Sequence, residues 1–144
     1  MFGLPLWILA PLTAVLLLCV IIELRTQLIV DLVTVPAAAY LLIANLVAGP
    51  KSAGAYLIAA IAIPIGFVIA GVVIPRRLGR GELIGMGAVK LLLVTSAALG
   101  GAGAFVAAGL FAALATVAVL IARQAAIPSS PLILLAVTAT LLST

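Results

Sequence analysis

Three carboxylates, Glu23, Asp31 and Glu82, are the only acidic side chains of this chain, and all three lie at the edges of apolar segments. The chain has no histidine, and its single cysteine, Cys19, lies inside an apolar segment. These counts exclude His-based triads, His-ligated metals, thiolate metal sites and a disulfide framework. We therefore expect no metal and no cofactor. On composition alone, Glu23 and Asp31 also fit an ordinary turn at a membrane edge, with their charges among lipid headgroups.

The segment 74–90 is the only long polar interruption in the sequence, and it contains Glu82 and most of the basic residues. It ends in Gly-Met-Gly-Ala-Val-Lys at positions 85–90. A purely structural interpretation exists for each charged residue. Glu82 can pair with a nearby arginine, which contributes little energy at a surface. Lys90 can extend its side chain to the headgroups while its stem stays in the apolar region.

Composition places the chain in a bilayer. It is 67% hydrophobic and 7% charged, whereas soluble domains are about 25% charged. Such a chain cannot cover itself with a water-compatible surface, so the sequence predicts an integral membrane protein whose first partner is the lipid bilayer. The net charge of +4 suggests nucleic acid binding only in a soluble protein. Here the basic residues lie between apolar runs, where they set orientation, and we expect no nucleic acid partner.

The elements that position these residues are apolar spans. About 20 apolar residues cross the hydrocarbon core as a helix. We predict an all-α integral membrane bundle of about six transmembrane helices, forming one domain over residues 1–144. The expected spans are residues 4–22, 32–48, 53–74, 89–99, 104–122 and 132–142. The first span has no preceding basic residue and no small-residue cleavage site, so we expect a membrane helix rather than a secretory signal.

Charge gives the expected orientation. If the six spans alternate, all Lys and Arg residues except Lys51 fall on one side of the membrane. Basic loops remain in the cytosol, so we expect a multi-pass protein of the cell membrane with both termini outside. Small residues four apart, as in Gly100/Ala104 and Gly109/Ala113, predict close packing against other membrane helices, including those of a second copy.

Two motifs resemble those of the type IV prepilin peptidases, the GxGD-type intramembrane aspartic proteases. Residues 22–36 are similar to the first motif, an aspartate followed by a short polar-apolar stretch and a proline. Residues 85–92 are similar to the second, Gly-x-Gly-Asp-x-Lys-Leu, which places Gly85, Gly87 and Lys90 in it. The resemblance covers essentially the whole chain. It corresponds to the short form of the family, without the methyltransferase segment and its cysteine-rich loop.

The resemblance implies a protease that cleaves the basic leader from type IV prepilins at the cytosolic membrane face. Two carboxyl groups would share a proton, one accepting from water and one donating to the peptide. Glu23 matches the first catalytic aspartate, but Ala88 stands where the second is expected. The resemblance therefore implies a chain that is inactive as written. Asp31, on a position that is ordinarily non-catalytic, and Glu82 are possible substitutes for the missing acid.

A second interpretation is a divergent, non-catalytic structural or assembly subunit of a larger membrane complex. A small transporter is less well supported, because carriers usually place ionisable groups inside their spans. In this chain all three acids lie at the predicted edges of the spans.

Overall fold

The structure, a computed structural model, describes residues 5–26, 31–49, 53–79, 81, 84–122 and 128–143. Its helices in chain order are α1 (Leu6–Thr26), α2 (Asp31–Ala48), α3 (Ala53–Val68), the π-helical segment η2 (Ile69–Val73), α4 (Ile74–Arg77), α5 (Met86–Leu99), α6 (Gly101–Ala122) and α7 (Ser129–Leu142). This part of the chain contains no strand, so the predicted all-α fold is confirmed.

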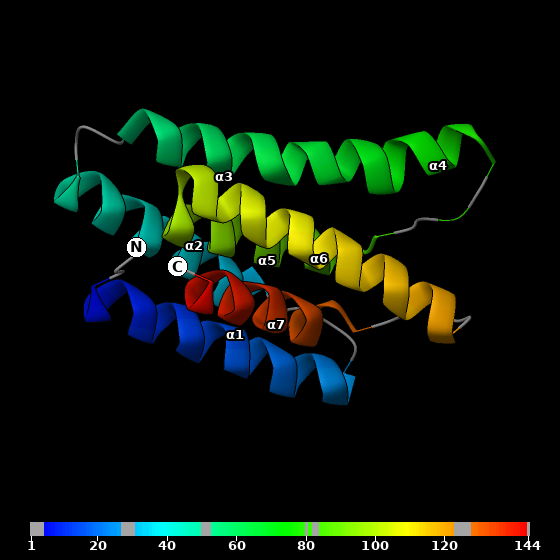
Figure 1. Ribbon diagram of the computed structural model, residues 1–144, viewed down its shortest axis with the longest axis horizontal. Coiled ribbons are helices and arrows are strands. Elements are labelled where there is room, and N and C mark those ends of the chain that lie inside the picture. Colours follow the sequence, from blue (N-terminus) through cyan, green and yellow to red (C-terminus); the bar gives the residue numbers. More distant parts are fainter. Residues whose placement is uncertain are drawn as a thin grey trace.

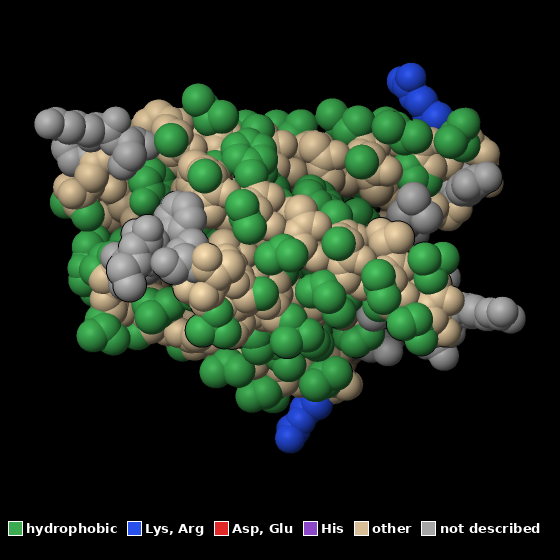
Figure 2. All heavy atoms as spheres, viewed as in Figure 1, with side chains coloured by type: hydrophobic (Ala, Val, Ile, Leu, Met, Phe, Trp, Pro, Cys, Tyr) green, Lys and Arg blue, Asp and Glu red, His purple; other side chains and the backbone are tan. Residues whose placement is uncertain are grey.

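Helix length and composition make the chain an integral membrane protein. Four helical stretches are long and apolar enough to cross a membrane: α1, α2, α6 and the continuous rod of α3, η2 and α4. Hydrophobic side chains cover most of the face shown in Figure 2. The helices α5 and α7 have 14 residues each and extend only about 21 Å, less than the ~30 Å hydrocarbon core. Both pack among the longer helices, which completes the expected bundle of about six helices.

The central element of the bundle is α5, which contacts α1, α2, α3, α6 and α7 (Figure 1). Most residues from 88 to 99 are buried, because these neighbouring helices surround α5 and its apolar side chains form much of the core. Its buried hydroxyls at Thr95 and Ser96 donate to the carbonyls of Leu91 and Leu92, at 2.9 and 2.6 Å. These local bonds allow polar side chains to lie inside an apolar core.

Successive helices run in opposite directions (Figure 1). The first end of the bundle holds the start of α1 and the end of α7. The second end holds the ends of α1, α4 and α6 and the starts of α2, α5 and α7. The motif-bearing segments that are far apart in the sequence therefore meet at the second end.

A tight turn joins α5 to α6 at Gly100. This residue has φ +58°, a backbone conformation that favours glycine. A Cβ atom built there would lie 2.1 Å from Cδ1 of Tyr56, because the tyrosine ring of α3 packs directly on the turn. Glycine is required at this position both by the dihedral angle and by the close approach.

Helix starts differ from the predicted spans. The fourth span was expected from residue 89, but α5 begins at Met86; the sixth was expected from residue 132, but α7 begins at Ser129. The spans were defined by continuous apolar sequence, whereas a helix continues through small or polar residues once its backbone bonds are satisfied. Gly85 and Pro128 precede the two starts in extended conformations, which marks where each helix begins.

Candidate functional site

Glu23 lies near the end of α1, and its carboxylate binds the first residues of α7. The Oε1 atom accepts bonds from the backbone N–H and the hydroxyl of Ser129, both at 3.0 Å. The Oε2 atom accepts the backbone N–H of Ser130 at 2.7 Å and also its hydroxyl. A carboxylate has about four lone-pair positions, so these four hydrogen bonds occupy the full accepting capacity of Glu23.

This contact serves as a helix cap supplied from another helix. Pro128 occupies the N-cap position of α7 and makes no side-chain cap hydrogen bond. The first N–H groups of a helix have no intrahelical acceptor, and the positive end of the helix dipole favours an anion. The Glu23 carboxylate supplies both the acceptor and the charge, so it holds α7 against α1.

Ala88, which matches the second catalytic aspartate, lies in the core. It is 1% exposed and belongs to the main cluster of buried apolar residues. Its backbone N–H donates to the Gly85 carbonyl at 3.0 Å, in the first turn of α5. The methyl group at this position provides no proton donor or acceptor. The resemblance implies that Glu23 and Ala88 lie close to each other, because they match the two members of a catalytic pair. This closeness stays a prediction.

Asp31 and Lys90 are brought together in an ion pair between Oδ1 and Nζ. The pair joins the start of α2 to the first turns of α5, and so connects the first motif to the second. The side chains are 64% and 33% exposed, respectively, so the pair contributes little to stability. The pair shows that the two motif segments lie side by side, where packing between α2 and α5 holds them.

At Gly85 of the second motif, neither the backbone conformation nor the surroundings require glycine. Gly85 has φ −71°, which any residue adopts, and a Cβ atom there would meet no atom of the described structure within 4 Å. Gly87 lies within the first turn of α5. Close backbone approach is instead found at Gly71 of η2, where a Cβ atom would lie 2.7 Å from Cβ of Ile84.

Ile84 joins the second motif to the α3–η2–α4 rod. Its N–H donates to the Gly71 carbonyl at 3.4 Å. In a regular α-helix the residue four positions later, Pro75, would be the donor, but proline has no N–H. Pro75 cannot donate to this carbonyl, which accepts instead from Ile84, the residue directly before Gly85.

Neither Ser129 nor Ser130 was predicted from the sequence. A signal was present, since two hydroxyl side chains stand between Pro128 and Pro131 at the start of the last apolar span. Glu82, the other candidate acid, lies outside the described residues. In the described part of the chain, no three His, Cys, Asp or Glu side chains lie close enough to hold a metal ion.

No protein-family model, curated protein or solved structure matches this chain. The likeness to the prepilin peptidases therefore rests on the two sequence motifs.

Proposed function

We propose that this chain is a prepilin-peptidase-like membrane protein that lacks proteolytic activity and acts as a structural subunit of a membrane complex. The two motifs support the family. The location of Glu23, Asp31 and Lys90 at one end of the bundle is consistent with it, because the family's chemistry takes place at one membrane face.

The proposed lack of activity rests on the residues at the two dyad positions, Glu23 and Ala88. An aspartic dyad needs two carboxyl groups that share one proton, with lone pairs directed at the attacking water. The Glu23 oxygens are already bound by four donors of α7, and Ala88 has no carboxyl group. Asp31 forms an ion pair with Lys90, which supports a role in joining α2 to α5 over one as the second acid.

The subunit role is favoured by an exposed face on α6. Gly109 and Ala113 lie one turn apart, both are exposed, and a Cβ atom at Gly109 would meet no described atom within 4 Å. Small residues at this spacing allow membrane helices to approach closely. In contrast, Ala104 of the pair Gly100/Ala104 is 1% exposed and is used inside the bundle.

Activity is tested with the purified full chain and a prepilin peptide carrying its basic leader, with an active prepilin peptidase as the positive control. We expect no cleavage product by mass spectrometry, since loss of one positioned acid or base typically costs about 10²–10⁴-fold in rate. Cleavage by the unmodified chain would disprove the proposal.

Restoration is tested with Ala88→Asp, alone and combined with Glu23→Asp. The combined variant restores the family's two aspartates, so we expect it to recover more cleavage than the single variant. Asp at position 23 also shortens the side chain that caps α7, which makes the carboxylate available. If both variants fold and neither cleaves, the family resemblance is limited to structure and the subunit role is favoured.

A further inference from the structure

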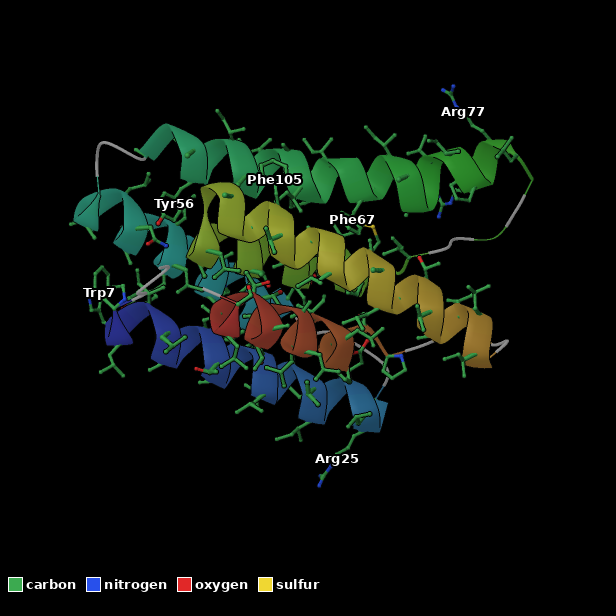
Figure 3. The ribbon with its side chains drawn as sticks, viewed as in Figure 1. Trp7, Arg25, Tyr56, Phe67, Arg77 and Phe105 are labelled. Atoms are coloured by element: carbon green, nitrogen blue, oxygen red, sulfur yellow. The ribbon has the colours of Figure 1, made fainter. Side chains whose placement is uncertain are left out.

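The charged side chains are unevenly distributed along the bundle. Every charged residue that the structure describes lies at the second end, where α1 and α4 stop and α2 and α5 start. The carboxylates there are engaged, Glu23 by α7 and Asp31 by Lys90. Arg25 and Arg77 are exposed and project from opposite flanks of the bundle (Figure 3). The described part of this end therefore presents positive charge.

Two amphipathic aromatic side chains, Trp7 and Tyr56, lie toward the other end. Trp7 and Tyr56 lie near the starts of α1 and α3, far from the two arginines (Figure 3). At 1.5 Å per residue, Trp7 and Arg25 are separated by about 27 Å along α1, and Tyr56 and Arg77 by about 32 Å along the rod. Both separations match a hydrocarbon core of about 30 Å. Each arginine therefore lies at the level of the headgroups when the aromatic residues lie at the opposite interface.

Each arginine also follows an exposed apolar stripe. Arg25 comes one and two turns after Ile21 and Leu18, which are 54% and 44% exposed. Arg77 comes one turn after Val73 and Ile74, which are also exposed. Residues three, four and seven apart share one helix face, so each guanidinium lies above apolar side chains that face outward.

We propose that Arg25 and Arg77 each bind the phosphate of an anionic phospholipid, with its acyl chains along the adjacent apolar stripe. The guanidinium group donates two parallel hydrogen bonds to phosphate oxygens. The stripe supplies the second half of the site, which a free anion would leave unused. Anionic lipids are favoured over zwitterionic ones because they carry no cationic headgroup that would oppose the arginine. This inference does not depend on the resemblance to peptidases.

The test uses the full chain purified in neutral detergent and native mass spectrometry. Phosphatidylglycerol and phosphatidylcholine with identical acyl chains are added in equal amounts. We expect preferential retention of phosphatidylglycerol. Each of Arg25→Gln and Arg77→Gln should lower the affinity of its own site about fivefold and leave the other site unchanged, and the double variant should lower both about fivefold, from the typical contribution of one basic residue near an anionic surface.

Arg25→Lys/Arg77→Lys is the matched control, because it keeps the charge and changes only the geometry of the donors. It should retain most of the preference, and circular dichroism should show the same helicity in all variants. Equal retention of both lipids by the parent chain would overturn the proposal, and so would a preference that survives in the double glutamine variant. Displacement of the lipid by an equal concentration of inorganic phosphate would also overturn it, because the apolar stripes would then contribute nothing.

Discussion

The Glu23 carboxylate has a structural role in the fold. Glu23 stands at the position that matches a catalytic aspartate of the peptidases. Its side chain has one more methylene than aspartate, so its carboxylate lies farther from the backbone. In the fold that carboxylate meets the unpaired N–H groups at the start of α7, whose own N-cap residue is a proline. A group that accepts four hydrogen bonds holds two helices together, and it is a poor base for an attacking water molecule.

The first prediction concerns this cap. Glu23→Gln keeps the shape of the side chain but removes the charge and replaces one acceptor oxygen by a donor. We expect a loss of about 1–2 kcal/mol in the free energy of unfolding, because charge-assisted bonds to helix N–H groups are lost. Ser129→Ala, which removes one hydroxyl and keeps both N–H donors, should cost less. Thermal unfolding in detergent and hydrogen exchange in the first turn of α7 measure the effect. An unchanged exchange rate there in Glu23→Gln would rule out the cap.

A second prediction at this scale compares two glycines. Gly100→Ala should destabilise the chain by at least about 1–2 kcal/mol, the cost of a left-handed residue with a Cβ atom, with a further loss from displacing Tyr56. Gly109→Ala is the control, because its surroundings are open and alanine favours a helix by about 1 kcal/mol. Denaturation midpoints should therefore move in opposite directions. Equal shifts would mean that the turn does not constrain position 100.

At the scale of elements, the sequence predicts the membrane helices from the lengths of its apolar runs. The six spans follow from runs of apolar residues, because the bilayer requires a minimum helix length. The contacts between helices that build the site cannot be predicted from these runs. Glu23 meets Ser129 across 106 positions, and Asp31 meets Lys90 across two intervening spans, with no local pattern that records either pairing.

The π-helical segment was also beyond prediction from sequence. The third span contains Pro64 and Gly66, residue types at which helices commonly kink, yet the irregular turn lies later, at Ile69–Val73, and ends two residues before Pro75. Its position depends on the missing N–H of Pro75 and on Ile84, which approaches from the following loop. That approach requires tertiary structure, so the sequence alone does not indicate it.

A third prediction tests this element. Gly71→Ala should destabilise the chain by about 1–3 kcal/mol, because its Cβ atom would lie 2.7 Å from Cβ of Ile84 and force two segments apart. Gly66→Ala on the same rod is the matched control, since its Cβ atom meets nothing within 4 Å. Unfolding curves for the two variants give the comparison. If both variants unfold alike, Ile84 does not pack on η2 as described.

At the scale of the whole molecule, the described charged residues lie at one end of the bundle, and Trp7 and Tyr56 lie toward the other. The described cations Arg25, Arg76, Arg77 and Lys90 lie at the same end, although they come from α1, α4 and α5. Moving several arginines across a hydrocarbon core is costly, so we expect this end to stay on the side where the chain is made. The helix α7 starts at this end and runs toward the other, with Ser143 directly after its last residue.

The last prediction follows from that arrangement. In a Cys19→Ala background, single cysteines are placed at Leu78, after the arginines of α4, and at Ser143, after α7; both positions are exposed. A membrane-impermeant maleimide should label Ser143→Cys on intact cells, because the orientation places this end outside. Leu78→Cys should react only after permeabilisation, which also controls for its reactivity. Labelling of Leu78→Cys on intact cells would reverse the orientation, and labelling of both positions from one side would contradict an up-and-down bundle that crosses the membrane.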